Sequence, residues 1–171
     1  ALYAAMTEDN STMLNNLETY YKKLDLNNIE YTDKNGIVLA RGHLPEKSND
    51  SKLDFPFTKK MLNSREKSWD YETGKRGVTL KFGVPIFVEK EFAGFIGYGY
   101  YINDDFMELM KETLKTDLIF IIKKDTKIAG STLKGIKTQD IINNYITSGL
   151  EGRETREYQR KIGDITYSCL Y

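Results

Sequence analysis

The sequence contains a single cysteine, Cys169, and a single histidine, His43. One cysteine excludes an internal disulfide, a Cys-x-x-Cys redox pair, a cysteine-rich zinc site and Cys-x-x-Cys-His haem attachment. One histidine leaves little material for a histidine-based metal site or a catalytic triad. Phosphate-binding loops and the common hydrolase, metalloprotease and EF-hand motifs are absent as well. The sequence therefore predicts a protein that is not an enzyme and that has no cofactor.

Neither sign of charge is in excess, because 25 Lys and Arg balance 25 Asp and Glu over 171 residues. A nucleic-acid partner is therefore not expected, since nucleic-acid-binding proteins normally show a basic patch or stripe.

Apolar runs such as residues 118–122 are far shorter than the roughly 20 residues of a membrane span. Hydrophobic residues still make up 40% of the chain, enough for a core. With Ala1 first and no signal peptide, we expect a soluble piece of a larger protein.

Residues 1–27 are predicted to form one long helix. No Gly or Pro interrupts the first 26 residues. Apolar side chains recur there at steps of three and four residues, the spacing of one helix face. They are Met6, Met13, Leu17, Tyr20, Tyr21 and Leu24.

A β-hairpin is predicted next, over residues 29–40. Two alternating segments flank the pair Asn35-Gly36, which is a strong signal for a tight turn. Residues 57–68 then show helical spacing after Pro56, a residue that the first turn of a helix tolerates.

Two long strands are expected at residues 78–88 and 92–102, followed by a short helix at 106–114. The second strand is unusual because Gly94, Gly97 and Gly99 alternate with bulky apolar residues. Glycine weakens a strand and is often retained where a ligand or another backbone comes close. The alternative is that glycine leaves room for large helix side chains above the sheet.

The remainder partly repeats this order. Residues 118–132 restate the hairpin, residues 136–146 look helical and residues 165–171 alternate as a strand. Paired strands favour an antiparallel α+β fold over a doubly wound α/β fold. We therefore predict a long N-terminal helix (1–27) and a PAS-like antiparallel sheet with flanking helices (28–114). Residues 115–171 are predicted to form a second, smaller or truncated PAS-like unit, or alternatively an extension of a single domain.

Several short motifs follow one another in a fixed order along the chain. They are Arg41-Gly42-His43-Leu44-Pro45 with Asn49-Asp50, the strand 77–86, Gly94-Phe95-Ile96-Gly97 and Asn103-Asp104-Asp105-Phe106. Together they resemble the motifs of Cache-type sensor domains, and most closely the double-Cache class of methyl-accepting chemotaxis receptors. The resemblance covers roughly residues 14–132. Two positions depart from the pattern, since Asn49 replaces a glycine and Lys81 replaces an arginine, which loses the planar two-point fork.

The resemblance implies a small-molecule sensor domain outside the cytoplasm, tethered to the inner or plasma membrane by segments beyond this sequence. A chemotaxis receptor is the first expectation, and the input domain of a sensor histidine kinase or of a diguanylate cyclase is the second. A ligand-free interaction module is a further alternative. Family members often pair along the N-terminal helix, so a homodimer is also expected.

The candidate ligand-binding residues are cationic or aromatic. Guanidinium and ammonium groups neutralise a carboxylate, hydroxyls orient it and rings cover its carbon skeleton. A small carboxylate or another anion is therefore the expected ligand. The candidates are Arg41, His43, Trp69, Tyr71, Lys81, Tyr98 and Tyr100.

Structural roles remain open for most of these residues. Arg41 and His43 share a strand parity, which would place both on one face. Arg41 can instead form an ion pair with Asp50, and His43 can orient a loop or lie in the core. Trp69 can fill the core, and Tyr98 and Tyr100 can pack on the sheet.

Overall fold

The computed structural model describes residues 10–74, 76–122, 127–137, 139–140, 142–143, 157–162 and 165–170. The chain forms two compact units, Ala1–Tyr101 and Ile102–Tyr171. The assignment of residues 28–114 and 115–171 to two sensor units stays a prediction.

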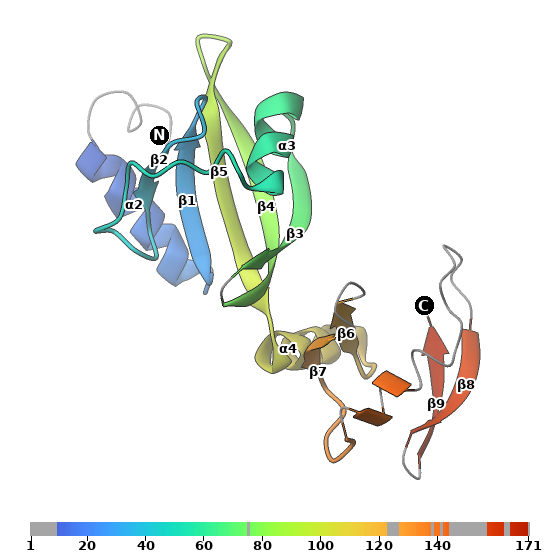
Figure 1. Ribbon diagram of the computed structural model, residues 1–171. Coiled ribbons are helices and arrows are strands. Elements are labelled where there is room, and N and C mark those ends of the chain that lie inside the picture. Colours follow the sequence, from blue (N-terminus) through green and yellow to red (C-terminus); the bar gives the residue numbers. More distant parts are fainter. Residues whose placement is uncertain are drawn as a thin grey trace. The chain divides into compact units, whose positions relative to one another are not determined.

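The N-terminal unit is built on a five-stranded sheet with the order β2-β1-β5-β4-β3 (Figure 1). Helix α2 packs against β1 and β2, and α3 packs against β3 and β4. The bounds are α2 (Asn10–Lys23), β1 (Asn28–Asp33), β2 (Val38–Arg41), α3 (Pro56–Ser64), β3 (Ser68–Gly74), β4 (Gly77–Val88) and β5 (Glu91–Ile102).

The two helices cover opposite faces of this sheet. Ile29 and Tyr31 of β1 belong to the buried cluster formed with Met13 and Leu17 of α2. Phe95 of β5 belongs instead to a buried cluster with two side chains of α3. Because neighbouring strand residues point to opposite faces, Glu30 and Thr32 lie on the α3 face. The sheet therefore has an α2 face, covered by α2, and an α3 face, covered by α3.

Gly83 on the α3 face makes room for a side chain of α3. A Cβ atom on Gly83 would collide with the Met61 side chain, and one on Gly97 would lie 3.9 Å from the Phe57 ring. Met61 is fully buried as a result.

For the three glycines of β5, the sequence left open a close backbone or room for helix side chains. A Cβ atom on Gly94 or Gly99 would collide with the backbone of a neighbouring strand, so a close backbone is observed at these two positions. Gly97 instead faces side chains of the α3 face.

The predicted α+β fold is confirmed, with one strand of the N-terminal unit missed. The hairpin of β1 and β2 and the long strands β4 and β5 lie where the sequence predicted them. The helix expected over residues 57–68 ends at Ser64, because Arg65 adopts a left-handed conformation with φ of 54°. Residues 68–74 then form the edge strand β3. The first nine residues of the predicted N-terminal helix lie outside the described residues.

The described part of the C-terminal unit includes helix α4 and two short hairpins. Helix α4 (Asp104–Leu114), which the sequence predicted over 106–114, begins after Asn103, whose side chain accepts a hydrogen bond from the Phe106 amide. Strand β6 (Ile119–Ile122) pairs with β7 (Lys127–Ser131), and β8 (Glu157–Ile162) pairs with β9 (Ile165–Leu170). The strand β8 was not predicted. Of the helix expected over 136–146, residues 139–140 and 142–143 are helical and residues 136–137 are not, while residues 138, 141 and 144–146 lie outside the described residues.

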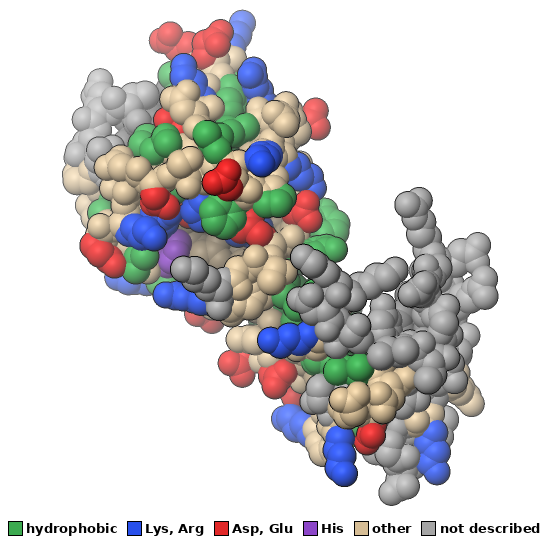
Figure 2. Space-filling model, viewed as in Figure 1, with side chains coloured by type: hydrophobic (Ala, Val, Ile, Leu, Met, Phe, Trp, Pro, Cys, Tyr) green, Lys and Arg blue, Asp and Glu red, His purple; other side chains and the backbone are tan. Residues whose placement is uncertain are grey.

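The surface of the N-terminal unit shows both signs of charge. On the face drawn in Figure 2, Lys and Arg side chains are interspersed with Asp and Glu. Among the described residues, no helix combines the length and apolar composition needed to cross a membrane.

Candidate ligand-binding site

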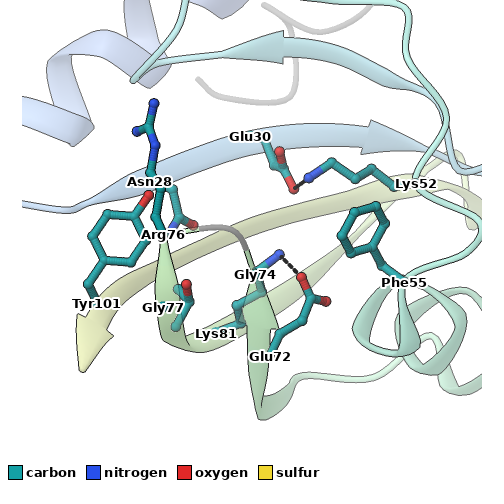
Figure 3. A pocket seen from close by; sticks show the side chains of 11 residues that line it. Asn28, Glu30, Lys52, Phe55, Glu72, Gly74, Arg76, Gly77, Lys81 and Tyr101 are labelled. Atoms are coloured by element: carbon teal, nitrogen blue, oxygen red, sulfur yellow. Dashed lines mark ion pairs between the residues drawn. The ribbon is translucent and has the colours of Figure 1, made fainter. Parts of the chain in front are cut away.

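A cavity of about 180 Å³ lies on the α3 face of the N-terminal unit (Figure 3). Lining residues alternate along the strands, as with Glu72 and Gly74 on β3 or Thr79 and Lys81 on β4, because every second residue faces the same side. The lining residues are Asn28, Glu30, Lys52, Phe55, Glu72, Gly74, Arg76, Gly77, Thr79, Lys81 and Tyr101.

Two ion pairs line the cavity. Lys52 Nζ lies 3.4 Å from Glu30 Oε1, and Lys81 Nζ lies 3.0 Å from Glu72 Oε1. All four side chains are at most 16% exposed. Both ammonium groups also approach the ring of Phe55, at 4.7 Å for Lys52 and 5.9 Å for Lys81. These contacts place charge next to an apolar surface, an arrangement suited to a small ligand with a polar and an apolar part.

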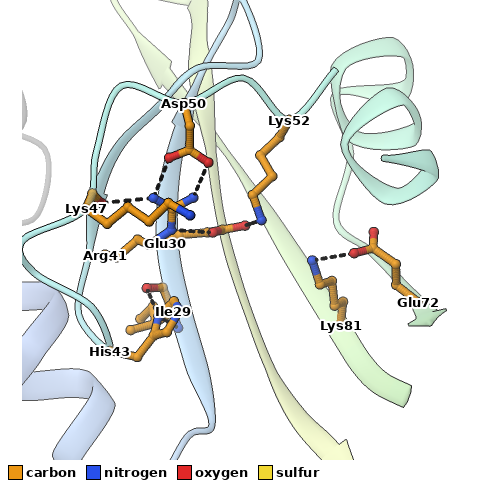
Figure 4. Close-up of polar contacts among 9 residues, drawn as sticks. All are labelled: Ile29, Glu30, Arg41, His43, Lys47, Asp50, Lys52, Glu72 and Lys81. Carbon is orange, nitrogen blue, oxygen red and sulfur yellow. Dashed lines mark hydrogen bonds and ion pairs between the residues drawn. The ribbon is translucent and has the colours of Figure 1, made fainter. Parts of the chain in front are cut away.

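Arg41 lies behind this cavity and does not line it. Its guanidinium donates to both carboxylate oxygens of Asp50, at 2.6 and 2.8 Å, and to the Lys47 carbonyl at 2.9 Å. Its Nε donates to Glu30 at 3.3 Å (Figure 4). The hydrogen bond from Arg41 lowers the pKa of Asp50. Arg41 thus has the structural role that the sequence allowed, and it holds the loop after β2 against the sheet.

His43 packs toward α2, away from Arg41. Strand β2 ends at Arg41, so the strand parity expected to align the two side chains does not extend to His43. Its Nδ1 lies 3.1 Å from the Ile29 carbonyl oxygen, and its ring centroid lies 6.4 Å from that of Tyr21. Burial lowers the pKa of His43, so the imidazole is neutral at physiological pH.

The aromatic candidates lie on the other face of the sheet. Tyr98 stacks on Phe82 and packs against the α2 cluster, and the Tyr100 hydroxyl donates to the Leu24 carbonyl at 3.2 Å. Trp69 and Tyr71 are 63% and 60% exposed on the edge strand. Asp70, which lies between them in β3, forms an ion pair with Lys60 of α3 and therefore lies on the α3 face. Trp69 and Tyr71 lie on the α2 face, because neighbouring strand residues point to opposite faces.

Of the seven residues chosen from the sequence, Lys81 alone lines this cavity. Sequence reasoning missed its ion-pair partner Glu72, the pair Glu30 and Lys52, and Arg76 in the turn between β3 and β4. Alternation along β3 and β4 places Glu72 and Lys81 on one face, but β3 was not recognised as a strand, so this signal was missed. Lys52 gave no signal of this kind, because it lies in an irregular loop.

Arg76 differs from the other cations around the cavity. It is exposed, and the described part of the chain provides no ion-pair partner for it. Figure 3 shows Arg76 at the same end of the cavity as Asn28 and Tyr101, with Lys52 and Phe55 at the opposite end. Three cationic and two anionic side chains therefore line the cavity.

Comparison with solved structures places the fold among sensor domains. The sensory domain of the Campylobacter jejuni chemoreceptor Tlp3 with isoleucine bound matches with a TM-score of 0.57 and 17% identity, over 95% of this chain and 69% of that one. The ligand-binding domain of Mlp24 with asparagine matches with a TM-score of 0.57 and 12% identity, over 94% and 68%. The sensor domain of the V. cholerae histidine kinase DctB matches with a TM-score of 0.57 and 10% identity, over 91% and 66%.

Among curated protein sequences, none matches this chain significantly. A family model described as a double sensory domain of two-component sensor kinases, dCache_3, matches residues 1–162. The match spans both units, and it agrees with the motif order and with the sheet that carries the cavity. The chain therefore belongs to the double-Cache family of sensory domains.

Proposed function

We propose that this chain is the extracytoplasmic sensor domain of a membrane-spanning bacterial receptor, and that the cavity of its N-terminal unit binds a small ligand. A methyl-accepting chemotaxis protein is the receptor we favour, with a sensor histidine kinase or a diguanylate cyclase as the alternative. Family membership and the folds of a chemoreceptor and a histidine kinase sensor domain support this proposal. The observation that carries it is the cavity, whose charged side chains face a space of ligand size.

The charge of the cavity favours a ligand with a carboxylate or another anionic group. Glu30 is shared between Arg41 and Lys52, and Glu72 is paired with Lys81. Arg76 is left as a cation without an ion-pair partner among the described residues. A guanidinium binds a carboxylate through two parallel hydrogen bonds, so Arg76 is our candidate for the first contact with the ligand.

The size of the cavity favours a ligand of a few heavy atoms. At about 180 Å³ it is slightly larger than an engineered cavity of about 150 Å³ that accepts benzene. The related ligand-binding domains were solved with isoleucine and with asparagine, which are of this size and carry a carboxylate. Amino acids and small carboxylates are therefore the ligands to test first.

A thermal-shift screen of amino acids, small carboxylates and amines on the full chain tests this function. A ligand at about 100 times its Kd stabilises the folded state by roughly 2.7 kcal/mol. For a chain of this length, that corresponds to a rise in Tm of about 5–10 °C. Calorimetric titration of Arg76→Ala and Lys81→Ala should show affinity reduced at least tenfold, with the exposed Lys67→Ala as control. No shift from any class, or full affinity in both variants, would overturn the proposal.

The exposed rings of Trp69 and Tyr71 favour a second candidate, a module that binds another protein and no small molecule. Exposed aromatic side chains are enriched at protein interfaces. In that case the screen gives no shift, and substitution of either ring weakens assembly of the receptor.

A further inference from the structure

We propose that Glu72 determines the specificity of the cavity, by selecting ligands that carry a cationic group as well as an anionic one. This inference rests on the proposed function, since it concerns the ligand of the same cavity. It goes further by naming the chemical class, a zwitterion such as an α-amino acid, and the residue that requires it.

The carboxylate of Glu72 is buried and only half satisfied. Its side chain is 11% exposed, and Oε1 accepts the ion pair from Lys81. Oε2 is also buried, and the described residues provide no hydrogen-bond partner for it. A buried carboxylate oxygen without a donor is destabilising, and a bound donor removes that cost. The cavity therefore has an acceptor that a ligand can satisfy.

The fold fixes Glu72 and Lys81 as a pair. In the register of β3 with β4, Glu72 is opposite Thr79 and Asp70 is opposite Lys81, so Glu72 and Lys81 are diagonal neighbours on one face. Nζ of Lys81 also lies 5.9 Å from the ring of Phe57, a residue of α3. Lys81 is thus held by its neighbours, and its ammonium faces Glu72 before any ligand arrives (Figure 4).

This pairing acts against a ligand that is only an anion. A simple carboxylate would compete with Glu72 for Lys81 while lying near the negative charges of Glu72 and Glu30. An amino acid avoids that conflict, because its ammonium can donate to Glu72 while its carboxylate meets Arg76. Charge-assisted hydrogen bonds of this kind are the stronger ones in proteins. Binding sites commonly achieve specificity by making the binding of the wrong ligand unfavourable.

The test is calorimetric titration of the full chain with the twenty L-amino acids. The tightest binder is then compared with its deaminated acid and its decarboxylated amine. We expect both analogues to bind at least tenfold more weakly than the amino acid. A deaminated acid that binds as tightly as the amino acid would overturn the inference, and so would small carboxylates binding where no amino acid does. Either of these two results is compatible with the proposed function, because a small ligand still binds. If no amino acid, carboxylate or amine binds, the proposed function itself is contradicted.

Variants assign the effect to Glu72. Glu72→Gln should weaken the amino acid at least tenfold and strengthen the deaminated acid, because Lys81 becomes available to a carboxylate. Glu66→Gln, an exposed position nearby, is the matched control and should change neither affinity. Unchanged affinities in Glu72→Gln would overturn the assignment. If circular dichroism shows that Glu72→Gln does not fold, Glu72→Asp is titrated in its place, and unchanged affinities in that variant overturn the assignment to Glu72. The comparison of the amino acid with its two analogues in the wild-type protein tests the zwitterion requirement independently.

Discussion

Arg41 and Asp50 form a two-point ion pair, with Nη1 2.6 Å from Oδ1 and Nη2 2.8 Å from Oδ2. The pair closes the loop between β2 and α3, and that loop carries Lys52 and Phe55 into the cavity wall. The Arg41 side chain is 4% exposed and also contacts Glu30, the partner of Lys52. Arg41 therefore supports the cavity from behind.

The first prediction is that Arg41→Ala lowers stability. Removing one partner of a buried ion pair leaves the other charge unpaired, which costs about 3–5 kcal/mol. Because Asp50 is partly exposed, we expect the lower end of that range in the free energy of unfolding, measured in urea. Arg41→Lys should recover part of the loss, since an ammonium cannot make both hydrogen bonds to Asp50.

Arg76→Ala is the matched control for Arg41→Ala. Arg76 is exposed, so its loss should change stability by less than about 0.5 kcal/mol while reducing affinity for the ligand. A stable Arg41→Ala protein with greatly reduced affinity would contradict this division of roles and return Arg41 to the ligand site.

The second prediction concerns pH. Burial lowers the pKa of His43 in the folded protein below the value of about 6.5 found in unfolded chains. The unfolded state then binds more protons below pH 6.5, so stability is full above that pH and falls as the pH drops. The slope for one group is at most about 1.4 kcal/mol per pH unit. Urea titrations between pH 8 and pH 5 should show this decline, and His43→Gln should remove it.

Asp50 affects the pH dependence of stability in a different, more acidic range than His43. Its pKa is lowered by the hydrogen bond from Arg41, so its contribution is present above the ordinary carboxyl range and is lost only at more acidic pH. A decline between pH 8 and pH 5 that persists unchanged in His43→Gln would show that another group is responsible.

The third prediction distinguishes two glycines of β5. A Cβ atom at Gly97 would make ordinary contacts, at 3.5 Å or more, with side chains of the α3 face. At Gly99 it would collide with the backbone oxygen of Leu80 on the neighbouring strand. We expect Gly97→Ala to be neutral or slightly stabilising, because glycine in a strand carries an entropic cost of about 0.5–1 kcal/mol. Gly99→Ala should destabilise by about 1–3 kcal/mol. Equal melting temperatures for the two variants would contradict this.

The sequence predicted those helices and strands whose pattern lies within a short stretch of neighbouring residues. Asn35-Gly36 specified the first hairpin, and regular alternation specified β4 and β5. Strand β3 was missed because Trp69 and Tyr71 alternate with acidic residues on an exposed edge, whereas a buried strand face alternates apolar with polar residues. An edge strand next to solvent gives a weak hydrophobic pattern.

The candidate site depended on information that periodicity does not contain. The parity argument for Arg41 and His43 required the strand to continue, and it ends at Arg41. Tyr98 and Tyr100 were chosen for their chemistry, but their parity along β5 places them on the α2 face. Lys81 lies on the other face of the sheet, the α3 face. The partner of Lys81 is fixed by the register of β3 with β4, which only the folded sheet determines.

The last prediction uses Trp69, the single tryptophan of the chain. Its ring is 63% exposed on the α2 face, whereas the cavity opens on the α3 face. A small ligand in the cavity should therefore leave the quenching of Trp69 fluorescence by acrylamide unchanged at saturation. Trp69→Ser should keep ligand affinity within twofold and change stability by about 0.5 kcal/mol or less. Ligand-dependent protection of Trp69, together with lost affinity in Trp69→Ser, would place the small-molecule site on the α2 face. Protection by a protein partner alone, with no ligand in the screen, would favour the interaction module.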